Sequence, residues 1–158
     1  MQRLIIEALD STGITVTNEQ GGQDLILSKA GFEDYYIEIK SRWKDKEQAI
    51  MSAMQFQKAV ANPERYALIS AQMWHFDQQR AVDGEVLKLE EMRQYLRVCD
   101  NIGTLEADLK KRVDEAFKGG EDDIRISGSY DVRVPQKVFN LDFAGLVEVL
   151  KTKFIVEI

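Results

Sequence analysis

The stretch "GGQDLILSKAGFEDYYIEIKSRW", residues 21–43, decides the fold because it carries two strand patterns joined by a turn. Residues 24–28 and 35–41 are rich in β-branched and aromatic side chains, which is typical of strands. Charged side chains nevertheless enter these strands, at Asp24, Glu38 and Lys40. A charge inside a packed sheet is costly unless it is paired or binds a metal. The three charged residues therefore indicate a functional site.

Hydrophobic periodicity and turn residues predict the other elements of the chain. The first half is expected to contain a helix over 2–12, strands over 14–17, 24–28 and 35–41, a helix over 46–61 and a buried strand over 66–71. The second half is expected to contain helices over 87–98, 105–117 and 143–154, with one or two strands within 124–134. Strand-helix-strand units need a crossover connection, so the pattern predicts an α/β fold with a central mixed sheet flanked by helices.

Length and composition predict a single domain. The chain has 158 residues with 44% hydrophobic residues, enough for one core. We divide it into a core over 1–71, a helical insertion or extension over 72–123 and a strand-helix element over 124–158. The charges of the 105–117 helix, Glu106 and Asp108 among them, are expected to form a solvated face. Because no apolar run reaches membrane-spanning length, we expect a cytoplasmic protein with no membrane partner.

Charge and rare residues narrow the function classes. The net charge of -6 argues against general attraction to nucleic acid, so a polyanion would need a local positive patch. Cys99 is the only cysteine and His75 the only histidine, which excludes disulfide frameworks, Cys/His zinc sites and cysteine proteases with a histidine partner. Cys99 is expected to be a core thiol, and His75 a packed or surface residue.

Strand alternation places Glu38 and Lys40 on one face and Ile37 and Ile39 on the other. A hairpin of this length can bring Asp24 beside Glu38, so two carboxylates and a lysine would meet at one end of the sheet. Two carboxylates with nearby carbonyl oxygens suit a hard cation such as Mg²⁺. A lysine beside them can orient an attacking water and balance charge on a phosphodiester, so the cluster suits phosphodiester hydrolysis.

"GGQDLIL" followed by "YYIEIK" resembles the signature of the PD-(D/E)XK nuclease superfamily, which has the restriction-endonuclease-like fold. Gln23 replaces the proline of that signature. "IEIKSRW", "MSAMQFQKAVANPERYALISA" and "YDVRVPQKVF" are similar, more narrowly, to the NO VEIN C-terminal-like nuclease domain. The helix motif of that family falls on Ser52, Gln55, Phe56 and Ala59, with Gln55 in place of an acidic residue.

The resemblance implies roles for individual residues. Asp24, Glu38 and the carbonyl of Ile39 would bind Mg²⁺, with Mn²⁺ as a substitute, and Lys40 would position the water. Gln55 would hold that lysine or the water. Glu7 resembles an acidic residue that many members place on their first helix.

A basic run follows the charged strand and would contact the phosphate backbone. It consists of Arg42, Trp43, Lys44 and Lys46, and Trp43 could stack on a base or cover the sheet edge.

Two functions remain open. The first is a Mg²⁺-dependent deoxyribonuclease in restriction, defence or repair. The second is a catalytically inactive nuclease-fold module that binds nucleic acid or docks within a larger ATPase or helicase assembly. A homodimer formed through the middle helices is compatible with both. The sequence leaves open DNA or RNA, and single or double strands, as the substrate.

Overall fold

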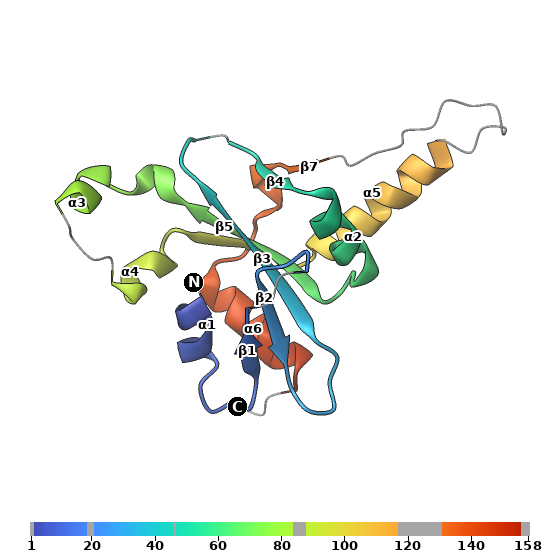
Figure 1. The fold of residues 1–158 in the computed structure, drawn as a ribbon, viewed down its shortest axis with the longest axis horizontal. Helices are drawn as coiled ribbons and strands as arrows, with labels where there is room; N and C mark the ends of the chain where they lie inside the picture. The colour runs from blue at the N-terminus through green and yellow to red at the C-terminus, as the bar shows by residue number, and fades with distance from the viewer. Residues whose placement is uncertain (1, 19–20, 46, 84–87, 117–130, 156–158) are drawn as a thin grey trace.

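The structure, a computed structural model, describes residues 2–18, 21–45, 47–83, 88–116 and 131–155. Its centre is a five-stranded sheet with the order β1-β2-β3-β5-β6, and β4 pairs with β7 in a separate ribbon (Figure 1). The strands are β1 (Thr15–Thr17), β2 (Leu25–Ser28), β3 (Tyr35–Arg42), β4 (Ala49–Met51), β5 (Tyr66–Gln72), β6 (Leu96–Cys99) and β7 (Val132–Val134). Because helices flank this sheet, the predicted mixed α/β fold class is confirmed.

The central sheet is mixed because its strands run in two directions. β1, β2 and β3 form an antiparallel meander, β3 and β5 are parallel, and β6 is antiparallel to β5. Parallel neighbours need a crossover, and the chain makes this one through β4 and a helix, α2 (Ala53–Ala61). The crossover brings α2 onto one face of β3.

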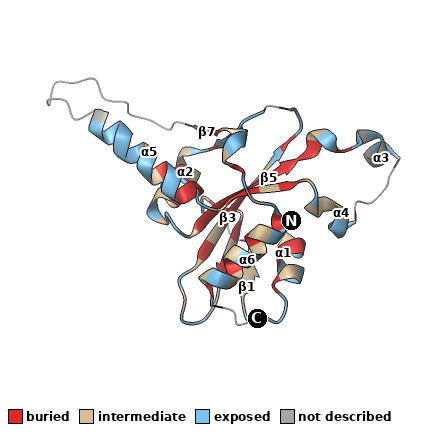
Figure 2. Ribbon diagram, turned by 180° about the vertical axis from the view of Figure 1, so that it is seen from behind, coloured by how far each residue is buried: buried red, intermediate tan, exposed pale blue. Residues whose placement is uncertain are grey.

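Helices cover the sheet on both faces. The remaining ones are α1 (Gln2–Ala8), α3 (Gln78–Val82), α4 (Leu89–Arg93), α5 (Ile102–Ala116) and α6 (Phe143–Lys153), with 3₁₀ turns at Met73–His75 and Gln136–Val138. One apolar cluster joins α1 and α6 to the sheet, and a second joins α2 and α5 to its other face. Figures 1 and 2 show α1 beside α6, and α2 against the beginning of α5.

The predicted helix over 46–61 is wrong in its first part. Helix α2 begins only at Ala53, because Ser52 caps it, and the preceding Ala49–Met51 forms β4 against β7. The two strands of this ribbon lie far apart in the chain, so local periodicity does not reveal their pairing. The predicted helix over 143–154 is confirmed as α6.

The predicted helix over 87–98 is also wrong in part. Only Leu89–Arg93 is helical, and Leu96–Cys99 forms β6 along the edge of β5. Hydrogen bonds to β5 satisfy the backbone there, and they outweigh local helical preference. Of the strands expected within 124–134, Val132–Val134 is confirmed, and residues 124–130 lie outside the described part.

Helix α5 departs from the expected solvated face at one position. Asp108, Lys110, Lys111 and Arg112 are exposed, but Glu106 is only 2% exposed, and within the described part its carboxylate oxygens have no hydrogen-bond partner. Burial raises the pKa of Glu106 to about 8. Cys99 is buried as predicted, and burial raises the pKa of its thiol to about 12.

His75 is exposed and stacks beside Trp74, with ring centroids 5.4 Å apart, so it has the surface position expected for it. In the described ranges, no helix has the length and the apolar content needed to cross a membrane.

Candidate active site

Three side chains form a closed cluster on the α2 side of the sheet. Lys40 Nζ lies 2.7 Å from Glu38 Oε1 and donates a hydrogen bond to Gln55 Oε1 at 3.0 Å. Gln55 Nε2 donates to Glu38 Oε1 at 2.5 Å. Glu38 and Lys40 come from alternate positions of β3 and Gln55 from α2, so the sheet and the crossover helix build the cluster together.

The start of α2 fixes the position of Gln55. Ser52 is the N-cap residue and Gln55 is the third helical residue, and the two form a capping box. Ser52 N donates to Gln55 Oε1 at 2.8 Å, so this oxygen accepts from both the backbone and Lys40. The amide can also donate to Glu38, which a carboxylate at this position could not do. Gln55 is therefore chemically suited to a place beside an ionised glutamate.

Asp24 lies one residue before β2 and is tied to β3 at two points. Its backbone N donates to Ile37 O at 2.9 Å, and its carboxylate Oδ2 accepts from Ile39 N at 2.7 Å. The side chain thus takes the place of a strand partner beyond the last β2–β3 pair, Leu25 with Ile37. This contact fixes the Asp24 carboxylate at the edge of β3.

The carbonyl group of Ile39 points to the same edge of β3 as the Asp24 carboxylate. In a strand, the N–H and C=O of one residue point to the same side. The N–H of Ile39 points to Asp24, so its carbonyl oxygen also faces the side on which Asp24 lies. The three groups implied as metal ligands therefore lie close together: Asp24 directly before β2, and Glu38 and the Ile39 carbonyl on β3.

The environment of Glu38 is costly for a negative charge. The residue is 2% exposed, and its Oε2 has no hydrogen-bond partner within the described part of the chain. Burial is the main cause that raises the pKa of Glu38, the hydrogen bond from Lys40 lowers it, and repulsion by Asp24 raises it again. A buried carboxylate oxygen without a partner, beside a second carboxylate, is a place where a cation would stabilise the charge.

The donor set fits a hard divalent cation better than zinc. All the candidate ligand atoms are oxygens, which Mg²⁺ and Mn²⁺ prefer. Among the residues that the structure describes, no group of three or more His, Cys, Asp and Glu side chains could hold a metal. Two carboxylates with a carbonyl are a small set, and such a set suits an ion that keeps several waters.

Glu7 does not join this cluster. The apolar side of α1, with Leu4 and Ile5, packs in the core that contains Ile37. Ile37 and Glu38 are adjacent on β3, so their side chains lie on opposite faces of the sheet. Glu7 is exposed on α1, and the structure gives it no hydrogen bond or ion pair with any described residue. The site role expected for Glu7 has no support in this geometry.

Arg42 differs from the surface position expected for it. It is 1% exposed, its Nε donates to Ser70 Oγ at 2.6 Å and its Nη1 donates to Glu47 O at 2.8 Å. Its guanidinium also lies over the rings of Trp74 and Phe139, at 5.3 and 4.8 Å from the centroids. Arg42 is the last residue of β3 on the Glu38 face, so packing encloses it instead of leaving it to a phosphate.

The rest of the basic run is more open. Trp43 is 49% exposed and Lys44 is exposed, while their backbone N–H groups bind Glu47 Oε2 at 3.1 and 3.3 Å. Lys46 lies outside the described residues. Of the predicted basic run, Trp43 and Lys44 are therefore the described residues that remain exposed to a ligand.

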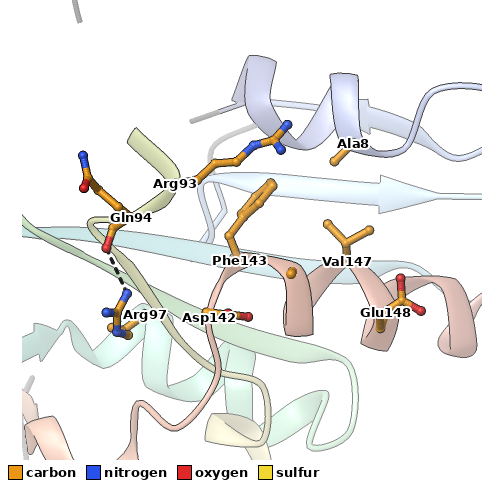
Figure 3. A pocket seen from close by; sticks show the side chains of 9 residues that line it. Ala8, Arg93, Gln94, Arg97, Asp142, Phe143, Val147 and Glu148 are labelled. Atoms are coloured by element: carbon orange, nitrogen blue, oxygen red, sulfur yellow. Dashed lines mark hydrogen bonds between the residues drawn. The ribbon is translucent and has the colours of Figure 1, made fainter. Parts of the chain in front are cut away.

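A pocket of about 650 Å³ lies away from these residues, among α1, α4 and α6. Figure 3 shows Arg93 reaching over Phe143, with the guanidinium 5.5 Å from the ring centroid, and Arg97 donating to Gln94 O at 3.0 Å. None of the predicted site residues lines this pocket.

Sequence reasoning did not single out two residues that support the site. Tyr66 is fully buried at the start of β5, and its hydroxyl donates to Gly22 O at 2.6 Å, two residues before Asp24. A tyrosine at the edge of an apolar strand has the pattern of a core residue, so no sequence signal distinguishes it. Gly22 is the second: two adjacent glycines at 21–22 indicate a turn, but not its contact with Tyr66.

Comparison with known proteins gives a family match for the first half of the chain. The family model described as Protein NO VEIN, C-terminal, matches residues 3–80, just under half of the chain. No curated protein and no solved structure matches the chain. Membership of the wider PD-(D/E)XK superfamily stays a prediction. The match confirms the resemblance over residues 3–80, which are similar to a nuclease-like family.

Proposed function

We propose that this chain is a metal-dependent nuclease that hydrolyses phosphodiester bonds of DNA with Mg²⁺, or with Mn²⁺ in its place. The observation that carries the proposal is the cluster of Glu38, Lys40 and Gln55 beside Asp24, with Glu38 Oε2 buried and without a partner within the described part. The similarity of residues 3–80 to a nuclease-like family supports the same reading.

Asp24, Glu38 and the Ile39 carbonyl are the groups that would hold the cation. When bound, Mg²⁺ would polarise the phosphoryl group and lower the pKa of water. Lys40 Nζ has three hydrogens, and within the described part of the chain it contacts Glu38 and Gln55. A third hydrogen can be donated to the attacking water or to a phosphoryl oxygen on which charge builds.

The reaction is a hydrolysis. The water oxygen forms the new bond to phosphorus, the bond from phosphorus to the leaving oxygen breaks, and the leaving oxygen ends protonated. Gln55 holds the Lys40 ammonium and the Glu38 carboxylate in position by hydrogen bonding to both. Trp43 and Lys44, exposed just after β3, would contact bases and phosphates next to the cut.

The test is cleavage of supercoiled plasmid and of linear single-stranded DNA by the purified chain in Mg²⁺ or Mn²⁺. We expect cleavage that EDTA abolishes and that Lys40→Ala lowers by at least about 100-fold. Lys151→Ala is the matched control, because Lys151 pairs with Glu148 at 3.1 Å on α6, on the opposite face of the sheet. It should cleave like the wild type.

A different outcome would favour the second function. DNA binding without cleavage in either metal, unchanged by EDTA and by Lys40→Ala, would contradict the nuclease proposal. It would instead support an inactive module that binds nucleic acid or docks within an ATPase or helicase assembly. Cleavage that Lys40→Ala leaves intact would show that the activity comes from elsewhere.

A further inference from the structure

The turn that precedes Asp24 is packed tightly against α2. Gly22 has φ +84°, a conformation that side chains disfavour. A Cβ at this position would lie 2.9 Å from Met54 O and 3.2 Å from Lys58 Cβ, both on α2. Glycine is therefore required for two reasons, and the turn sits directly on the helix that carries Gln55.

A second contact holds the same turn from the sheet. Tyr66 is fully buried at the start of β5 and donates its hydroxyl hydrogen to Gly22 O at 2.6 Å. Burial, together with repulsion by Glu38, Glu106 and Asp24, raises the pKa of this hydroxyl. The hydroxyl therefore remains a donor over the whole working range of pH.

We infer that Tyr66 is a positioning residue that, with Gly22, fixes the Asp24 carboxylate for the cation of the proposed site. Asp24 follows Gly22 by two residues, and its N–H and carboxylate are tied to Ile37 and Ile39 of β3. The Tyr66 bond supplies the third attachment. Carboxylates held in place before the ion arrives bind it more tightly, because the free energy of ordering is spent in folding.

The inference rests on the proposed function only for its metal readout, so the experiment has two readouts. The first is amide hydrogen exchange at Asp24, whose N–H is bonded to Ile37 O. The second is the affinity for Mn²⁺ measured by electron paramagnetic resonance. Tyr66→Phe removes only the hydroxyl. We expect exchange at Asp24 to accelerate and Mn²⁺ affinity to fall about 3- to 10-fold, the loss of one hydrogen bond.

Tyr35→Phe is the matched control. Tyr35 is also fully buried, on β3, and its hydroxyl donates to a backbone carbonyl, Asp100 O, at 3.4 Å. Its side chain packs in the core on the other face of the sheet. We expect this variant to change overall stability similarly, but to leave exchange at Asp24 and Mn²⁺ affinity at the wild-type level. Gly22→Ala provides a second variant, which should act like Tyr66→Phe by pushing the turn off α2.

The outcomes separate the two claims. Wild-type exchange at Asp24 in Tyr66→Phe, or equal acceleration in Tyr35→Phe, would overturn the positioning role whatever the metal does. Selective acceleration in Tyr66→Phe, in a protein whose wild type shows no Asp24-dependent Mn²⁺ binding, would support the attachment and contradict the proposed function. Selective acceleration with weakened Mn²⁺ binding would support both.

Discussion

The two faces of the central sheet differ in what they bury. On the α1 and α6 face, β3 contributes Tyr35 and Ile37 to an apolar core. On the α2 and α5 face, the neighbouring positions of β3 and β5 bury polar and charged side chains. They are Glu38, Arg42, Ser70 and Gln72, joined by Glu106 from α5. Burying such groups opposes folding, and on β3 and β5 they are concentrated on the face that carries the candidate site.

The sharpest contrast is expected between adjacent residues of β3. Glu38→Gln should lower cleavage by at least about 100-fold with little loss of folded protein, because it removes a candidate cation ligand and keeps the shape. Ile37→Ala should instead destabilise the protein by about 2–5 kcal/mol, the cost of a core cavity, and keep the activity of the folded fraction.

Cleavage rates and urea unfolding of both variants measure this contrast. Loss of activity in fully folded Ile37→Ala would contradict the difference between the two faces. A loss of stability alone in Glu38→Gln would contradict it as well.

Gln55, the third helical residue in the capping box of α2, should have the next largest effect. Gln55→Ala removes the bonds that connect Glu38, Lys40 and the helix N-terminus, so we expect cleavage to fall about 10- to 100-fold. Gln57→Ala, two residues along the same helix and exposed, should have no effect on cleavage. Equal losses in both variants would indicate damage to α2 in general.

Glu106 makes the polar face sensitive to pH. The pKa of this group is about 8 when folded, above its ordinary value of 4.5, so the folded protein binds a proton that the unfolded chain releases. Its contribution to the free energy of unfolding is therefore complete below about pH 4.5 and is lost as pH rises toward 8 and beyond.

Urea unfolding at several pH values tests this dependence. Glu106→Gln should remove it and raise stability at pH 9 by on the order of a few kcal/mol. Asp108→Asn, an exposed change on the same helix, should keep the wild-type dependence. The same slope in Glu106→Gln as in the wild type would mean that folding does not raise the pKa of Glu106.

The smallest effect on function is expected at Lys44, which is exposed just after β3. Lys44→Ala should weaken DNA binding a few-fold and reduce the dependence of affinity on salt, as the loss of one phosphate contact does. Arg42→Ala should lower stability because it empties a buried position between Trp74 and Phe139. Binding titrations at several salt concentrations measure the first change. A larger change in salt dependence for Arg42→Ala than for Lys44→Ala would contradict the placement of Arg42.

The elements that the sequence predicts well are those that local pattern determines. β3 and β5 follow from apolar runs of strand length, and α6 from its periodicity. β4 and β6 are not predicted from the sequence. Their conformation depends on hydrogen bonds to β7 and β5, which are distant in the chain. Charge on a helix indicates a solvated surface in general, which is why the buried position of Glu106 needs the structure.

The candidate site also contains residues that the sequence predicts and residues that it does not. Asp24, Glu38 and Lys40 are predicted site residues because three charges interrupt strand patterns and because the motif resembles a nuclease family. The double role of Gln55 depends on how α2 is capped, and the Tyr66 contact depends on a register between strands, so neither follows from spacing alone. Glu7, which the resemblance implies as a site residue, lies on α1, and α1 packs on the face opposite to Glu38.

The most direct test of the account is the binding of Mn²⁺ to the wild type, followed by electron paramagnetic resonance without any nucleic acid. We predict a single site whose affinity falls at least 10-fold in both Asp24→Asn and Glu38→Gln and is unchanged in Glu33→Gln, an exposed acidic residue paired with Arg65. Mn²⁺ binding that all three variants retain equally, or no binding by the wild type, would contradict the claim that the polar face is built around a cation.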